Sequence, residues 1–175
     1  MAEVILVDAS DRPLGRMEKL AAHVPPGTLH RAFSVFLFSP SGRWLLQRRA
    51  AGKYHFPGLW TNACCSHPAP GEGTAEAAAR RLREELRLAE TPELAEQFSF
   101  VYRAESAATG LCEYEFDHVF FGGLADLPAS PDPEEVAEVR FWEPDELAKA
   151  LAETPGAFTP WFRIAWEEIR KGAGK

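Results

Sequence analysis

The stretch TAEAAARRLREELRL, at positions 74–88, is the strongest secondary-structure signal in the chain. Five apolar residues recur there at the spacing of one helix face: Ala75, Ala78, Ala79, Leu82 and Leu86. Arg80 and Glu84 are four residues apart and can pair on the surface of such a helix, and Thr74 can cap its first turn. An amphipathic helix of this kind must pack against another element, which the rest of the chain has to supply.

β-prone runs precede and follow this helix. The sequence predicts strands over 4–8, 32–38, 43–49, 97–106, 111–124 and 138–142, and helices over 143–153 and 159–172. Proline and glycine break up 17–30 and 51–73, which we expect to be loops, and DRPLG at 11–15 indicates a turn. This order predicts an α/β (α+β) fold, a sandwich in which helices flank a mixed sheet, with residues 1–175 forming a single domain.

Charge and composition exclude several classes of protein. The formal net charge of −7 disfavours nonspecific binding to nucleic acid. No apolar run approaches the roughly 20 residues of a membrane span, and the N-terminus has no signal-peptide pattern. Three cysteines, two of them adjacent at Cys64 and Cys65, argue against a disulfide framework. We therefore expect a cytoplasmic protein that binds neither membranes nor nucleic acid.

Several residue pairs have the spacing of metal ligands. Glu113 and Glu115 share one face of a strand, roughly 6.5–7 Å apart along it. If the opposite face is the core, these carboxylates point into solvent or a cleft. Cys65 and His67 have the same spacing. Taken singly, each pair is explained as well by a solvated face, a packed thiol or a structural histidine.

Taken together, five residues form a more informative set. His23, His30 and His67 with Glu113 and Glu115 match the ligand preferences of a divalent metal such as Mn²⁺ or Zn²⁺. Their convergence in space is not given by the sequence.

The helix and the residues before it resemble the Nudix box, G-x5-E-x7-R-E-U-x-E-E-x-G-U with U aliphatic. Six positions are in register: Glu72, Arg80, Leu82, Glu84, Glu85 and Leu88. Three depart, with Ser66 and Arg87 in place of glycines and Arg81 in place of a glutamate. The change of a carboxylate to a cation at Arg81 argues against hydrolysis of a pyrophosphate.

A wider resemblance covers about residues 3 to 163. WTNACCSHP at 60–68, E-x-E at 113–115 and FTPWF at 158–162 are similar to type I isopentenyl diphosphate isomerases. EKLAAHVPPGTLHRAFSVFLF and LLQRRAAGKYHFPG match the same family in order. That family interconverts isopentenyl and dimethylallyl diphosphate through a tertiary carbocation, in isoprenoid biosynthesis.

The resemblance implies a role for each matching residue. Cys65 and Glu115 are the two proton carriers, with Tyr102 beside Glu115; we favour Glu115 with Tyr102 as donor and Cys65 as acceptor. The ligands of one divalent metal, Mn²⁺, Zn²⁺ or Mg²⁺, are His23, His30, His67, Glu113 and Glu115. A separate Mg²⁺ joins the diphosphate to Glu85 and to the backbone carbonyl of Cys65. The substrate contacts are Lys19, Arg49, Lys53, Arg81 and, facing the carbocation, Trp161. His55, His118 and Trp60 have no counterpart in the site and are expected to be structural.

Two other functions compete with the isomerase. A Nudix-type diphosphate hydrolase would need a glutamate at position 81 and has no use for Cys65. A metal-binding or redox-sensing protein built on Cys65 and His67 leaves the basic residues unexplained. The isomerase uses all of these residues with a small-molecule substrate, and we expect a monomer, with a dimer as the alternative.

Overall fold

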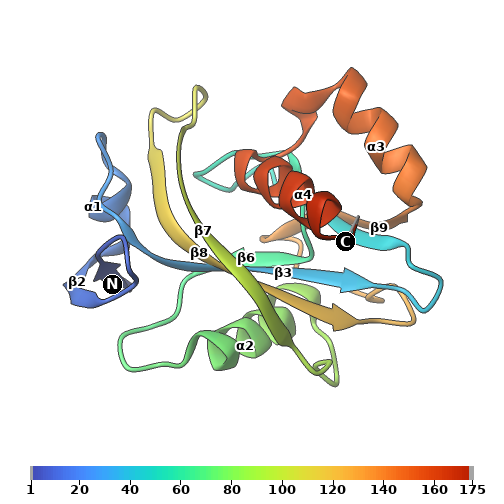
Figure 1. Cartoon of the computed structure of the whole chain (residues 1–175), viewed down its shortest axis with the longest axis horizontal. Helices are drawn as coiled ribbons and strands as arrows, with labels where there is room; N and C mark the ends of the chain where they lie inside the picture. The colour runs from blue at the N-terminus through green and yellow to red at the C-terminus, as the bar shows by residue number, and fades with distance from the viewer. Residues whose placement is uncertain (1, 174–175) are drawn as a thin grey trace.

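The computed structural model describes residues 2–173, which form one curled sheet with helices on both faces (Figure 1). Over this range the sheet has nine strands: β1 (Glu3–Val7), β2 (Pro13–Glu18), β3 (His30–Phe38), β4 (Trp44–Arg49), β5 (Trp60–Thr61), β6 (Cys64–Ser66), β7 (Ala95–Glu105), β8 (Cys112–Gly123) and β9 (Val136–Trp142). The helices are α1 (Lys19–His23), α2 (Thr74–Leu86), α3 (Pro144–Glu153), α4 (Pro160–Ala173) and the 3-10 turn η1 (Pro155–Ala157). None of these described helices is both long and apolar enough for a membrane span.

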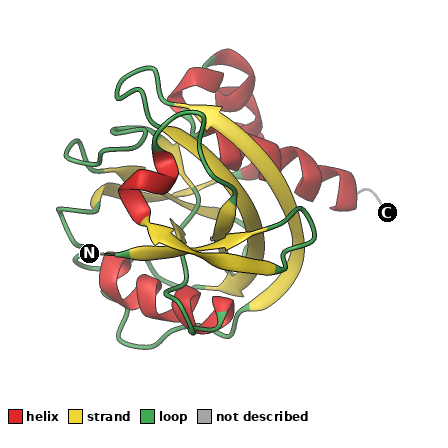
Figure 2. Cartoon of the chain, turned by 90° about the vertical axis from the view of Figure 1, so that its left-hand side faces the viewer, coloured by secondary structure: helices red, strands yellow, loops and turns green. Residues whose placement is uncertain are grey.

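Strand β3 is the centre of the sheet. One of its edges pairs in parallel with β8 from His30 to Phe38. Its other edge is shared in turn by β1, β6 and β4, all antiparallel. Three short partners along one edge let the sheet split and curl, as Figure 2 shows. The predicted mixed sheet is confirmed.

The two faces of the sheet are covered by different helices. On one face α2 packs Ala77, Ala78, Leu82 and Leu86 against residues that include Phe33 of β3. On the other face α4 contributes Trp161, Phe162 and Trp166 to a second apolar cluster. Figure 1 shows α2 on one side of β3 and β8, and α3 and α4 on the other. The predicted sandwich of helices around a mixed sheet is confirmed.

Helix α2 differs from its prediction in detail. It ends at Leu86 rather than at 88, because Arg87 adopts a left-handed backbone conformation with φ of 52°. Gly73, not Thr74, precedes its first turn, and the Glu76 carboxylate accepts a hydrogen bond from the Gly73 amide at 3.2 Å. Ala75 is exposed and Ala77 is buried in its place, so the apolar face is rotated from the one expected.

Segments expected to be loops or turns contain short regular elements. Residues 17–30 include α1, whose first turn is capped by the Glu18 carboxylate, and the first residue of β3. Residues 51–73 include β5 and β6, and β2 begins within the turn expected over 11–15. Strands β5 and β6 form through pairing with β4 and β3, and such non-local pairing leaves little local signal.

Gly27 lies in the turn between α1 and β3. Its φ is +81°, and a Cβ there would lie 3.0 Å from the Cys112 sulfur and 3.2 Å from the Tyr114 Cβ. The turn therefore needs glycine both for its backbone conformation and for its close approach to β8. Because His23 and His30 flank this turn, Gly27 also sets where their rings meet.

We expect Gly27→Ala to lower the free energy of unfolding by about 2–4 kcal/mol, because left-handed strain and overpacking add. Gly42→Ala is the matched control, since Gly42 also has a positive φ of +83° but open space around its Cβ position. Strain alone should cost that variant about 1–2 kcal/mol. Urea unfolding measures both, and equal losses would show that the contact with Cys112 is unimportant.

Candidate active site

Three strands bring the first residues of the site together. His30 begins β3 opposite Glu115 of β8, and Glu115 lies opposite Tyr102 of β7. Residues in one such row point to the same face of a sheet, and all three side chains are buried. Tyr102 donates a hydrogen bond from its hydroxyl to Glu115 Oε2 at 2.6 Å.

Glu113 and Glu115 do not point into solvent, which was one of the two environments expected for them. Both are buried, on the side of the sheet that packs toward α4, whereas Tyr114, Phe116 and His118 are only partly buried on the other side. The carboxylates therefore do not lie on a solvated face. They project from the inner face of the curled sheet.

Five side chains converge on this point from four segments. His23 ends α1, His30 begins β3, His67 follows β6, and Glu113 and Glu115 belong to β8. One ligand atom from each lies within 4.8 Å of all the others. The structure thus brings together the whole set that the resemblance implied.

The hydrogen bonds of the histidines make this cluster suitable for a metal. Nδ1 of His23 lies 2.6 Å from the Lys19 carbonyl and Nδ1 of His30 lies 2.7 Å from the Thr28 carbonyl. Each Nδ1 therefore holds the ring proton, and in the neutral ring Nε2 presents a lone pair. This is the arrangement that orients histidine ligands in metal sites.

The lone pairs face other acceptors. Nε2 of His30 is 3.1 Å from Nε2 of His67, which is 2.7 Å from Glu115 Oε1, and Nε2 of His23 is 3.0 Å from Glu113 Oε2. Each of these contacts needs a proton or a metal ion between its two atoms. Buried imidazole and carboxylate ligands suit a divalent metal ion.

Without a metal, protons have to supply that positive charge. Burial lowers the pKa of His23, but its contacts with Glu113 and Glu115 outweigh it and raise the pKa to about 10. Burial dominates at His67 and lowers its pKa to about 3. Burial raises the pKa of Glu115, yet hydrogen bonds from the three histidines bring it well below the usual range. In this form, therefore, His23 is charged and Glu115 is ionised.

Two residues of this region were not recognised from the sequence. His55, expected to be structural, has its Nδ1 3.0 Å from Glu113 Oε1, and its ring lies 4.2 Å from that of His23. Asp117 continues the alternation of Glu113 and Glu115, and its carboxylate accepts from the Ser34 hydroxyl at 2.7 Å. The spacing of these three acids could have revealed Asp117, but no local pattern marks His55. His118 lies outside the cluster, between Asp11 and Glu96.

Cys65 lies on β6 and lines the same cavity as Tyr102, Glu115 and Trp161. Its sulfur is 3.6 Å from Arg49 Nη1. Burial raises the pKa of the Cys65 thiol to about 12, although Arg49 acts in the opposite direction. Burial likewise raises the pKa of Tyr102 well above its usual range. Cys65 and Tyr102 therefore both hold their protons at neutral pH in this form of the protein.

Asn62, three residues before Cys65, hydrogen-bonds to three parts of the site. The Asn62 side-chain amide donates to the carbonyls of Val35 and Cys64 at 3.1 and 2.6 Å. Its oxygen accepts from the Trp161 indole N–H at 3.2 Å. Asn62 thus fixes Cys64–Cys65 against β3 and Trp161 against the cavity. Asn62 belongs to the WTNACCSHP motif, but nothing in the local sequence indicates this bonding role.

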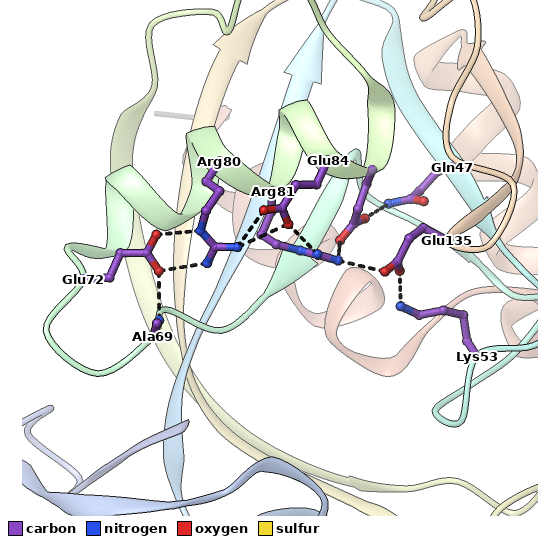
Figure 3. Close-up of polar contacts among 9 residues, drawn as sticks. Gln47, Lys53, Ala69, Glu72, Arg80, Arg81, Glu84 and Glu135 are labelled. Atoms are coloured by element: carbon purple, nitrogen blue, oxygen red, sulfur yellow. Dashed lines mark hydrogen bonds and ion pairs between the residues drawn. The ribbon is translucent and has the colours of Figure 1, made fainter. Parts of the chain in front are cut away.

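Four basic residues belong to the lining of this cavity. Lys19, Arg49, Lys53 and Arg81 all line it. Arg81 Nη2 donates to Glu85 Oε1 at 2.7 Å, and Glu85 also accepts from the Gln47 amide at 3.0 Å (Figure 3). Glu85 is buried, and because carboxylate oxygens are ligands that Mg²⁺ prefers, it is a candidate metal ligand as well.

Glu72, just before α2, and Glu84 within α2 are both paired with arginines. Arg80 donates to both oxygens of Glu72, at 2.7 and 2.8 Å, and also contacts Glu84 at 3.2 Å (Figure 3). Arg81 Nη1 donates to Glu84 Oε2 at 2.6 Å. These carboxylates are thus engaged in ion pairs along the surface of α2.

Comparison with known proteins identifies related sequences. The family described as NUDIX domain matches residues 28–162. The "Isopentenyl-diphosphate Delta-isomerase" of Streptomyces griseus is 52% identical over 165 residues, which cover 94% of this chain and 82% of that protein. The protein of the same name from Nocardia farcinica is 50% identical over 176 residues, covering 98% and 99% of the two chains.

Solved structures share the fold at lower identity. DR0079 from Deinococcus radiodurans superposes with a TM-score of 0.73 at 21% identity, covering 97% of this chain and 98% of that one. A MutT protein from Methanosarcina mazei gives a TM-score of 0.65 at 20% identity, covering 84% and 96%. At these identities the likeness establishes the fold alone.

We expect a divalent metal to bind the His/Glu cluster and to stabilise the protein. At a metal concentration 100 times the Kd, the free energy of unfolding should rise by about 2.7 kcal/mol. Binding should also release a proton at neutral pH, because the metal displaces the one that His23 holds. Titration calorimetry with Mn²⁺ in two buffers of different ionisation enthalpy measures both affinity and proton release.

Glu115→Gln should lose most of this binding, since the amide is a weaker ligand. Glu96→Gln is the control, because Glu96 is an exposed acid that contacts His118 on the other face of β8. Equal Mn²⁺ affinity in the two variants would contradict a metal site at the cluster.

Proposed function

The chain belongs to the isopentenyl-diphosphate Delta-isomerases of the NUDIX domain family, and from this membership we propose that it interconverts isopentenyl diphosphate and dimethylallyl diphosphate. The reaction moves a double bond by adding a proton to one carbon and removing a proton from another. It therefore needs two proton carriers in one cavity that excludes water. The observation that carries the proposal is that Cys65 and the Tyr102–Glu115 pair line the same cavity.

We assign Cys65 and Glu115 as the proton carriers, with Tyr102 coupled to Glu115. The preferred donor is the Glu115–Tyr102 pair, which keeps a proton on Tyr102 beside an ionised carboxylate. Cys65 as acceptor requires a lowered pKa, whereas burial raises its pKa to about 12 in the protein alone. The acceptor role therefore depends on further positive charge near Cys65 beyond Arg49.

We assign two separate sets of ligands to two divalent cations. His23, His30, His67, Glu113 and Glu115 would hold Mn²⁺, Zn²⁺ or Mg²⁺, and Glu85 with the Cys65 carbonyl would hold the Mg²⁺ that accompanies the diphosphate. When bound, such cations fix the carboxylates and favour the ionised forms of neighbouring acids and thiols. Support comes from the lone pairs of the histidines, which already face one point.

The carbocation needs a stabilising group that does not react with it. The buried Trp161 indole lines the cavity and is held by Asn62. An aromatic face near a cation contributes roughly 0.5–2 kcal/mol. Phe56 packs edge-on against Trp161, which limits other orientations of the indole.

The diphosphate requires positive charge, which an overall acidic protein can supply only locally. We assign Lys19, Arg49, Lys53 and Arg81 to this role, because all four line the cavity that Cys65 and Glu115 share. The charge of these four residues suits a small anionic substrate. A cytoplasmic location, a monomeric state and a single domain over residues 1–175 remain predictions.

Hydrolysis of a diphosphate is the less favoured function. A Nudix hydrolase uses box carboxylates to hold metals, but here Glu72 and Glu84 are engaged by Arg80 and Arg81. A metal-binding or redox-sensing role would not explain why four basic side chains line the cavity. Neither alternative explains why Tyr102 is hydrogen-bonded to Glu115.

Incubation of purified protein with isopentenyl diphosphate, Mg²⁺ and Mn²⁺ tests the proposal. Acid-labile allylic product and free phosphate are measured in parallel. We expect allylic product without phosphate, and a fall in kcat of at least about 10²-fold in Cys65→Ala and in Glu115→Gln, as for loss of a general acid or base.

Glu96→Gln should retain the activity of the unaltered protein, because Glu96 lies on the opposite face of the sheet from Glu115. Phosphate or pyrophosphate release without allylic product would identify a hydrolase instead. Undiminished activity in Cys65→Ala would remove Cys65 from the reaction.

A further inference from the structure

One carboxylate at the cation cluster has no role in the reaction as described above. Glu135 precedes β9, and its two oxygens contact two different cations: Oε1 accepts from Arg81 Nη2 at 3.1 Å, and Oε2 accepts from Lys53 Nζ (Figure 3). Lys53 and Arg81 come from separate parts of the chain, a loop after β4 and the helix α2. Glu135 therefore joins two cations that nothing in the local sequence would hold side by side.

The backbone around Glu135 makes the same connection. The Ala50 amide donates to the Glu135 carbonyl at 3.0 Å, at the start of the loop that carries Lys53. The Asp132 amide donates to the Glu85 carbonyl at 2.8 Å, near the C-terminal end of α2. Residues 132–135 thus tie the Lys53 loop to the end of α2, and the Glu135 side chain completes this tie between the two cationic side chains.

The charge of Glu135 suits this position. Burial raises the pKa of its carboxyl, but Lys53 and Arg81 outweigh burial and hold it below the usual range. At neutral pH the carboxylate is therefore ionised. It offsets the mutual repulsion of two cations that would otherwise move apart in the free protein.

The arrangement also separates Glu135 from the reacting centre. Lys53 and Arg81 line both the cavity that contains Cys65 and the groove outside it, whereas Glu135 lines only the groove. Lys53 and Arg81 therefore lie between the cavity and the Glu135 carboxylate. A diphosphate in the cavity meets the cations first and the negative charge behind them.

We propose that Glu135 is a positioning residue for diphosphate binding, which holds Lys53 and Arg81 at the spacing the diphosphate needs. The proposal rests on the proposed isomerase function. Lysine has a long flexible side chain, and ordering it before the ligand arrives reduces the entropy that binding must offset. Glu135 acts through the two cations and does not touch the reacting atoms.

Steady-state kinetics with isopentenyl diphosphate provide the first test. Glu135→Ala should raise KM about tenfold, within the range of coupling between charge pairs, and leave kcat within about threefold. Glu138→Ala is the matched control, because Glu138 lies on β9 and pairs with Arg48, which does not line the cavity. Its KM should equal that of the unaltered protein.

A double-mutant cycle distinguishes positioning from general damage. In a Lys53→Ala background, Glu135→Ala should raise KM by a smaller factor than it does alone, because half of its partners are gone. Thermal unfolding of each variant checks that the fold is intact. An unchanged or lower KM in Glu135→Ala, or effects that multiply independently, would overturn the proposal.

Calorimetry with Mg²⁺ and inorganic pyrophosphate tests the same inference without catalysis. Glu135→Ala should bind pyrophosphate about tenfold more weakly than Glu138→Ala does, matching the change in KM. If the unaltered protein forms no allylic product, the proposed function fails, and this binding measurement still decides the role of Glu135. Equal binding by the two variants would overturn the inference while leaving isomerase activity untouched.

Discussion

The convergence of five potential metal ligands, four buried and His67 half-buried, is the constraint on which the rest of the site depends. Histidines and carboxylates from α1, β3, β8 and the segment after β6 place lone pairs within 4.8 Å of one another. Burying unbalanced charge is costly, so such a cluster persists only with protons or a metal ion among its members. Backbone carbonyls of Lys19 and Thr28 fix two of the rings, so the short helix α1 and the turn after it serve chiefly to orient ligands.

Arg49 links this cluster to the other half of the site. Its guanidinium donates to the His55 carbonyl, approaches the Cys65 sulfur at 3.6 Å and lies 5.5 Å from the centre of the Trp161 ring. His55 in turn contacts Glu113. One buried cation therefore connects the thiol, the aromatic wall and the carboxylate cluster, and the loop 51–58 is held in place by the site as much as by the sheet.

The layers of the fold could be predicted from the sequence because local patterns mark the helices and strands that form them. The period of residues 74–86 and the β-prone runs around it were sufficient to predict a sheet between helices. Alternation placed Glu113 and Glu115 on one face, but could not say that this face is the inner one, because that depends on how β3 pairs with β8. The short strand β6 and the contacts of His55 and Glu135 arise from residues distant in sequence, and no local pattern marks them.

Arg81 explains how a scaffold shared with hydrolases can favour another chemistry. A carboxylate at this position would add negative charge beside Glu84 and Glu85 and help to gather metals for attack on phosphorus. The guanidinium instead pairs with both acids and, with Glu135, forms a chain of alternating charges that reaches Lys53. Such a chain can hold a diphosphate through fixed hydrogen-bond donors while providing no nucleophile near phosphorus. Under the proposed assignment the double bond is the reactive part of the substrate, because Cys65 and Glu115 line the same cavity, and a base at position 81 of α2 withholds a metal-binding carboxylate from the diphosphate end.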